Sequence, residues 1–197
     1  MKLNARELRD VDEGEVAEKL KTIKRRPIYF ILENIYDTYN IGGLFRLADA
    51  LAIEKMYICG ESEIPPNSKI KKASIGTYKV VPWEYAKTVE EVVIRLRSQY
   101  RKTSDVKRKN DTGIITEKHS NDIQIIAVEQ HKTSVPYTMI NYSEPVALIL
   151  GNETSGIMKE TLALVDHIAE IPMWGINKSL NVIVSAAIVS YHIATKT

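Results

Sequence analysis

A continuous apolar run at residues 28–32 most constrains the fold of this 197-residue chain. A strand that is apolar at every position, without alternation, is typical of a sheet buried on both faces. Further strand-length runs follow at 55–59, 80–81, 123–128, 146–150 and 167–171. Helical patterns lie between them at about 40–51, with Asn40 as the expected N-cap, and at 88–101. This alternation predicts an α/β fold with a mostly parallel sheet and helices on both faces.

The last helical pattern begins near Ser179 and is apolar on two sides. One side carries Leu180, Val184, Ala187, Ile188 and Tyr191. The second side carries Val182, Ile183, Ala186, Val189 and Ile193. A helix that is apolar nearly all round has to be buried on more than one face. The pattern fits a contact with a second copy of the chain, and it also fits a deep position within one chain.

The length suits one domain with a sizeable core. We expect a basic helical arm at residues 1–26, a single α/β domain at 27–197 and a flexible insertion, with a possible short hairpin, at 102–122. The N-terminus is charged and has no apolar core, so it does not resemble a signal peptide, and no apolar run is long enough for a membrane span. Cys59 is the single cysteine, which excludes an internal disulfide and fits the cytoplasm.

The net charge of +2 conceals strong segregation along the chain. Residues 69–109 carry 12 basic and 4 acidic side chains, whereas residues 27–68 and 110–197 are both net acidic. A basic block of this kind is a candidate contact surface for a polyanion such as RNA. A solvated charged face would explain the charge alone equally well.

Several classes of site are disfavoured. The sequence contains no G-x-x-x-x-G-K-[ST] loop, no G-x-G-x-x-G after the first strand and no G-x-S-x-G elbow. Its four histidines show no metal-ligand spacing, so we expect no metal site.

Three glycine-containing segments remain as candidates for chemistry. They lie at residues 40–46, 150–156 and 171–182, and the last two follow expected strands, where α/β proteins bind ligands. Each has a plain structural explanation when taken singly. The glycines could serve turns or close packing, Arg46 could pair with Asp49, and Ser179 could be a helix N-cap.

Together and in this order, the three segments resemble the motifs of the SpoU/TrmH-type RNA ribose 2′-O-methyltransferases of the SPOUT superfamily. The family's Asn-x-Gly-x-x-x-Arg is matched at 40–46, and its Gly-x-Glu-x-x-Gly at 151–156. Its Ile-Pro-Met-x-Gly is matched at 171–175, followed by Ser-Leu-Asn-Val at 179–182. Ile183 and His192 depart from the common pattern, which has serine and glutamate there. The resemblance runs from about residue 27 to the C-terminus and excludes 102–122.

The resemblance implies a deep C-terminal trefoil knot whose loops bind S-adenosylmethionine (AdoMet). The cofactor-binding residues that it implies are Leu150, Gly151, Ile171, Met173, Ser179 and Leu180. The catalytic residues that it implies are Arg46, Asn40, Glu153, Ser179 and Asn181. Arg46 would bind the adjacent phosphate and stabilise charge on the ribose 2′-oxygen, or would abstract the proton, and both roles stay open. The other four would orient Arg46, the substrate or the start of the last helix.

The resemblance further implies an RNA substrate and a homodimer formed through the knot region and the terminal helix, with no membrane partner. We expect RNA phosphates to contact Lys24, Arg25, Arg26, Arg46, Lys71 and Lys72, together with the basic segment at 107–109. The compact layout favours tRNA over rRNA. The alternative is a catalytically inactive protein that binds RNA or AdoMet on the same fold.

Overall fold

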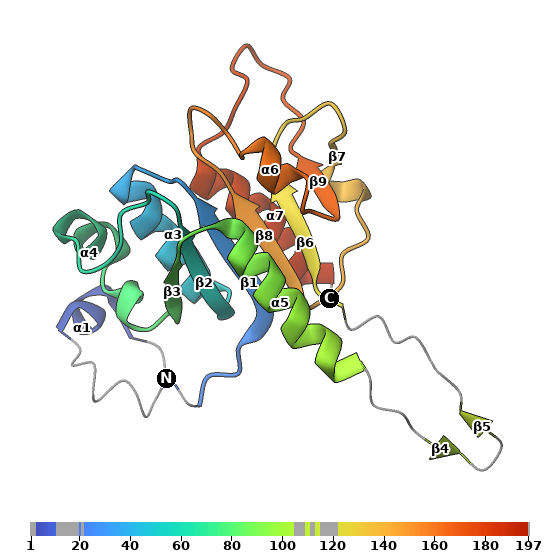
Figure 1. The fold of residues 1–197 in the computed structure, drawn as a ribbon. Coiled ribbons are helices and arrows are strands. Elements are labelled where there is room, and N and C mark those ends of the chain that lie inside the picture. The colour runs from blue at the N-terminus through green and yellow to red at the C-terminus, as the bar shows by residue number, and fades with distance from the viewer. Residues whose placement is uncertain are drawn as a thin grey trace.

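The computed structural model describes residues 3–10, 20, 22–104, 109–110, 113–114 and 122–196. A seven-stranded sheet in the order β3-β2-β1-β8-β6-β9-β7 forms its centre (Figure 1). The strands are β1 (Arg26–Glu33), β2 (Ile53–Cys59), β3 (Trp83–Ala86), β6 (Gln124–Val128), β7 (Val135–Pro136), β8 (Val146–Leu150) and β9 (His167–Glu170). Every pairing within this sheet is parallel, which confirms the expected fold class.

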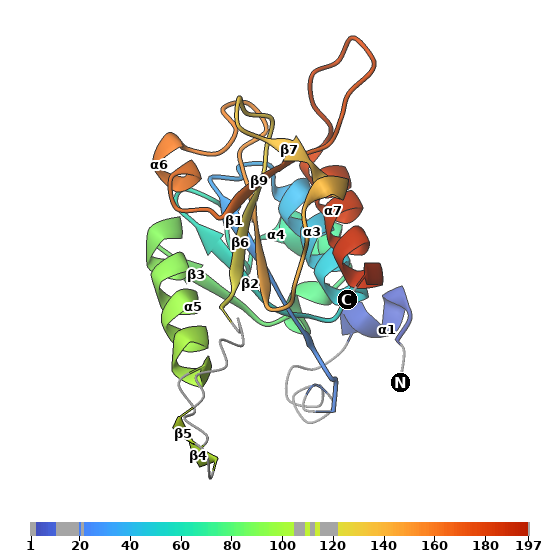
Figure 2. The ribbon, with the colours of Figure 1, turned by 90° about the vertical axis from the view of Figure 1, so that its right-hand side faces the viewer.

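Helices cover both faces of the sheet (Figure 2). One face carries α5 (Val89–Ser104) and α6 (Lys159–Leu162), and the other carries α3 (Thr38–Ala50), α4 (Ser68–Ser74) and α7 (Val182–Lys196). Successive residues of β1 supply the two cores in turn, because strand side chains alternate between faces. Phe30 packs into the core under α3 and α7, whereas Tyr29 and Ile31 pack into the core under α5.

Short elements connect these layers. The helix α1 (Ala5–Asp10) lies against the turn before η1 (Thr77–Lys79), where the backbone oxygen of Leu8 would be 2.3 Å from a Cβ added at Gly76. A second 3-10 turn, η2 (Tyr137–Met139), precedes β8, and β4 (Lys109–Asn110) pairs antiparallel with β5 (Gly113–Ile114) as a short hairpin. The rest of the expected N-terminal helix, at 11–19 and 21, and the basic residues 107–108 lie outside the described residues.

Two local expectations were wrong. Residues 80–81 end a 3-10 turn, and the strand begins only at Trp83. Pro82 has no N–H to donate to the neighbouring strand, so regular pairing cannot start before it. Its carbonyl accepts the N–H of Met56 at 2.9 Å. The N-cap of α3 is Asp37, whose carboxylate accepts the N–H of Tyr39 at 2.8 Å. Asn40 lies inside the first turn of α3, so its side chain is free for another role.

The two apolar sides of α7 differ in burial. The side with Val182, Ala186, Val189 and Ile193 is buried against α3 and the sheet. The other side is partly open, with Val184 45% and Tyr191 48% exposed. The helix therefore keeps one apolar face that the described chain does not cover.

The burial of Cys59 in the core predicts a pH dependence of stability. Burial raises the pKa of its thiol to about 12, well above the ordinary value of about 8.5. The unfolded chain loses this proton at lower pH than the folded one, so the Cys59 contribution to stability is full below about pH 8.5 and declines between there and about pH 12. We expect urea unfolding to show a loss of up to about 1.4 kcal/mol per pH unit in that window. Cys59→Ala should reduce this slope, and an unchanged slope would contradict the assignment.

Among the described residues, no helix is long and apolar enough to cross a membrane.

Candidate active site

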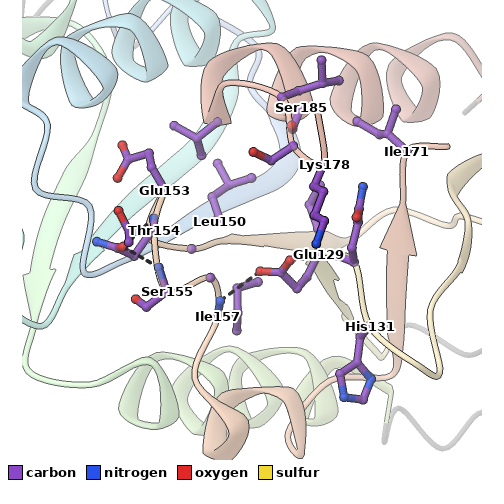
Figure 3. Close-up of a pocket in the computed structure, with 18 of the residues that line it drawn as sticks. Glu129, His131, Leu150, Glu153, Thr154, Ser155, Ile157, Ile171, Lys178 and Ser185 are labelled. Carbon is purple, nitrogen blue, oxygen red and sulfur yellow. Dashed lines mark hydrogen bonds between the residues drawn. The ribbon is translucent and has the colours of Figure 1, made fainter. Parts of the chain in front are cut away.

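A pocket of about 600 Å³ opens at the carboxyl ends of β6, β8 and β9 (Figure 3). Parallel strands commonly place ligand sites at this edge, where backbone groups leave the sheet. Its walls come from the ends of those three strands, the loop at 150–157, the loop at 171–181 and the start of α7. All six residues expected to bind a cofactor line it: Leu150, Gly151, Ile171, Met173, Ser179 and Leu180.

The loop at 150–157 is held in a compact turn by its own groups. The Asn152 side chain accepts the N–H groups of Thr154 and Ser155 at 2.8 and 2.9 Å and donates to the Asn34 carbonyl at 2.8 Å. Gly151 is required by close approach, because an added Cβ would lie 2.7 Å from backbone atoms of both Gly156 and Ile157. The loop therefore has little freedom to change shape.

A buried carboxylate supports the far end of this loop. Glu33, at the end of β1, is only 4% exposed and accepts the N–H of Met158 at 2.8 Å. Its second oxygen accepts the hydroxyl of Thr161 in α6. The end of β1 is thereby tied to the loop that follows β8.

Three side chains expected at the site form one hydrogen-bonded chain across the fold. Asn40 in α3 donates from its amide nitrogen to the Glu153 carboxylate. The Asn40 amide oxygen accepts from the side chain of Asn181 at 2.9 Å. Asn40 is 5% exposed, so both halves of its amide are satisfied within the protein. This network joins the first, second and third motifs in one place.

Asn181 also starts the last helix. Its side-chain oxygen accepts the N–H of Ile183 at 2.8 Å, and its backbone carbonyl accepts the N–H of Ser185 at 3.0 Å, which is the pattern of an N-cap. The expectation that the helix begins near Ser179 was therefore wrong by about one turn. Ser179 lies in the preceding loop, where its N–H contacts the Asn177 side chain at 3.4 Å.

Arg46 lies two turns beyond Asn40 on α3 and is exposed. Its guanidinium forms no hydrogen bond or ion pair with any described residue. The pairing with Asp49 that would give Arg46 a purely structural role is therefore absent from the described structure, and Glu153 does not hold the guanidinium. Figure 3 places Glu153 on the side of the pocket toward α3. The free guanidinium on α3 is available to a ligand that extends beyond the pocket.

The basic residues expected to bind RNA differ in their freedom. Lys24, Lys71 and Lys72 are exposed. Arg25 donates to the carbonyls of Ile53 and Val80 at 3.1 and 2.8 Å, and burial lowers its pKa despite the nearby carboxylates.

Arg26 is also engaged within the protein. It pairs with Glu144 at 2.7 Å and donates to the Ala194 carbonyl at 2.7 Å. Arg25 and Arg26 therefore hold the start of β1 in place, whereas the three lysines and Arg46 are the freer cations of the set.

Sequence reasoning missed Glu129, which lines the pocket directly after β6. The rule that drew attention to the loops after β8 and β9 applies equally to this position, because a polar residue at the carboxyl end of a parallel strand faces the same edge. Within the described part of the chain, no group of three or more metal-ligating side chains gathers at the pocket or elsewhere.

Comparison with known proteins agrees with this arrangement. The model of the SpoU rRNA methylase family matches residues 27–112 and 93–191. The chain is 26% identical over 172 residues to the tRNA (guanosine(18)-2′-O)-methyltransferase of Escherichia coli K12, covering 85% of this chain and 63% of that protein. It is also 26% identical over 176 residues to the 23S rRNA (guanosine(2553)-2′-O)-methyltransferase RlmP of Bacillus subtilis, covering 89% and 60%.

A solved structure shares the fold. The SpoU methyltransferase AviRb from Streptomyces viridochromogenes, in complex with the cofactor AdoMet, superposes with a TM-score of 0.71 at 21% identity, covering 88% of this chain and 59% of that one. The trefoil knot is characteristic of this fold, and its crossing remains a prediction for this chain.

The chain spans somewhat less than two thirds of the length of the curated relatives that it matches first. The family match and the three joined motifs lead to one conclusion: this chain belongs to the SpoU rRNA methylase family.

Proposed function

We propose that this protein is an AdoMet-dependent RNA methyltransferase that methylates a ribose 2′-hydroxyl. The observation that carries the proposal is the Asn181–Asn40–Glu153 network, which joins a pocket for a small molecule to the helix that presents Arg46. The relatives' names support both the reaction and the class of substrate.

The pocket suits AdoMet. Its volume of about 600 Å³ lies within the usual range for small-molecule sites, which is about 300–1,000 Å³. Leu150, Ile171, Met173 and Leu180 offer apolar surface for a purine, and the loop backbones offer donors and acceptors for its edge. Bound AdoMet would supply the methyl group on a sulfonium, which is already a good leaving group.

The protein's own task is to place the 2′-oxygen in line with the methyl group and to stabilise the charge that develops on it. Arg46 can do both, since an exposed guanidinium can bind the adjacent phosphate in a bidentate manner while facing the 2′-oxygen. Arginine side chains keep their proton at neutral pH, so stabilisation of charge is a better assignment for Arg46 than proton abstraction. Asn40 and Asn181 would position the start of α3 and α7 around the substrate.

RNA would contact the protein through exposed lysines, two of which lie on the helix that packs against α3. Lys71 and Lys72 lie on α4, which packs directly against α3, and Lys24 precedes β1. Such phosphate contacts position RNA and carry little sequence information. The two relatives named for tRNA and for rRNA are equally similar in sequence, so the preference for tRNA stays a prediction.

Transfer of labelled methyl from AdoMet into unmodified tRNA and unmodified rRNA tests the proposal. Label in one RNA class, with one nucleotide linkage resistant to alkali, is the expected result. Calorimetric binding of AdoMet without any label in either RNA would favour the alternative, a binding protein without catalysis.

The loop at 150–157 gives a second test. Gly151→Ala is expected to weaken AdoMet binding by about tenfold, because the new methyl group would displace the backbone of Gly156 and Ile157 at the pocket wall. Calorimetry would measure the affinity, and circular dichroism would show that the sheet is intact. Unchanged affinity would show that this wall does not contact the cofactor.

We also propose that the protein is a homodimer in the cytoplasm. The open side of α7 and the adjacent loop expose Val184, Tyr191, Trp174 and Ile176, the last two to 93% and 101%. Such an apolar surface is typical of a protein contact. We expect sedimentation to show a dimer at micromolar concentration and Val184→Asp to yield a monomer. Ile94→Asp, at a 61% exposed position on α5, should remain dimeric. A monomeric unsubstituted protein would contradict the proposal.

A further inference from the structure

Glu129 is a pocket carboxylate that the three motifs leave unexplained. It follows β6 directly and lines the same pocket as Glu153, which the Asn40 network holds (Figure 3). The described part of the chain gives it no ion pair. Lys159 and Lys178 also line the pocket, but neither forms an ion pair with Glu129, so the carboxylate keeps acceptor capacity that a ligand can use.

Two backbone groups fix the orientation of this carboxylate. One oxygen accepts the N–H of Ile157 at 3.0 Å, and the other accepts the N–H of Gln130 at 2.8 Å. Gly156 permits this position, because it has a φ of +69° and an added Cβ would lie 2.4 Å from the carboxylate. The loop after β8 and the carboxylate after β6 are therefore built to fit each other.

An ionised carboxylate can accept about four hydrogen bonds, two on each oxygen. With one position on each oxygen occupied, one acceptor position on each remains. Two neighbouring hydroxyl groups, as on the 2′ and 3′ carbons of a ribose, present a matching pair of donors. Acidic residues bind ribose hydroxyls in this way at the strand ends of dinucleotide-binding folds.

The strand order favours the ribose over the cationic end of the cofactor. Asn40 and Glu153 mark the side of the pocket toward β1 and α3, where Arg46 would hold the methyl acceptor. Glu129 lies at the end of β6, two strands from β1 and therefore about 10 Å away across the sheet. A cofactor with its sulfonium toward Arg46 would extend its nucleoside over β8 and β6.

We propose that Glu129 binds the ribose hydroxyls of the nucleoside cofactor while it holds the loop at 150–157. This inference rests on the proposed function, because it assumes that AdoMet occupies the pocket. It adds a cofactor-binding residue that lies outside the three motifs.

Calorimetry with S-adenosylhomocysteine and its 2′-deoxy and 3′-deoxy analogues tests the proposal without any need for turnover. The unsubstituted protein should bind at least one deoxy analogue roughly 10- to 100-fold more weakly than the parent compound, as expected for a hydrogen bond to a charged group. In Glu129→Gln this ratio should fall to a few-fold, because a neutral amide is a weaker acceptor and can offer only one oxygen. The matched control is Glu160→Gln, an exposed carboxylate of α6 outside the pocket lining, which should keep the full ratio.

The ratio of parent to deoxy-analogue affinity separates recognition of the ribose hydroxyls from support of the loop. A defect in the loop would weaken the binding of all the ligands alike and leave the ratio unchanged. A ratio near one in the unsubstituted protein would overturn the inference, as would a large ratio that Glu129→Gln leaves unchanged. Loss of all binding in a folded Glu129→Gln protein would assign Glu129 to the loop alone and would also overturn it. If the unsubstituted protein bound none of the compounds, the proposed function itself would fail.

Discussion

Arg46→Ala is expected to lower methyl transfer by at least about 100-fold while AdoMet affinity changes by less than about twofold. Arg46 is exposed on α3 and does not line the cofactor pocket, so its removal should leave the pocket intact. The loss would reflect the developing charge on the 2′-oxygen, which the guanidinium would no longer stabilise. Single-turnover methylation of the substrate RNA and calorimetry with AdoMet would measure the two quantities separately.

Two companions sharpen this experiment. Arg46→Lys keeps the charge but not the planar fork, so we expect an intermediate rate. Arg95→Ala removes another exposed arginine, which pairs with Glu84 on the opposite layer of the sheet, and should methylate normally. A folded Arg46→Ala protein that failed to bind AdoMet would place Arg46 in the cofactor site and contradict its assignment to the RNA.

Gly42→Ala is expected to lower the free energy of unfolding by about 3 kcal/mol. An added Cβ at Gly42 would lie 2.4 Å from the Cβ of Ala73 and 2.9 Å from the backbone nitrogen of Ser74. Both atoms belong to α4, which packs along α3 and cannot move aside without losing that interface. Urea unfolding of the variant and of the unsubstituted protein would measure the difference.

Gly43→Ala is the matched control for this contact. Its added Cβ would meet the Cδ1 of Ile183, the end of a flexible side chain, so we expect a loss of about 1 kcal/mol or less. Alanine improves helix propensity by about 1 kcal/mol at both positions, so the comparison isolates the packing. Equal stabilities would show that α3 and α4 are not held as closely as the structure indicates.

The sequence was most informative where a local pattern decides the structure. Buried strands of parallel sheets read as unbroken apolar runs, so β1, β6 and β8 were located to within about two residues. The short helix α4 was missed, because seven residues with three lysines carry too little periodicity. The strand expected at 80–81 was misplaced, because valine favours strands whereas Pro82 sets where the ladder can begin.

The sequence predicted individual residues of the site but not the hydrogen bonds between them. The motifs identified Asn40, Glu153 and Asn181 as site residues. The residues expected to bind the cofactor all line the pocket. Their connections were not predictable, because Asn40 lies 113 residues from Glu153 and 141 from Asn181 along the chain. Glu129 was overlooked because a single acid after a strand has no motif of its own.

The sequence by itself determined the α/β class, the parallel sheet and the family, since these follow from apolar periodicity and from short motifs that each lie within one segment. The tertiary structure alone decided that Asn181 caps α7 while it bonds to Asn40, that Arg25 and Arg26 are used internally and which side of α7 stays open. Hydrogen bonds and burial of this kind depend on which distant segments meet, and local propensity carries no information about that.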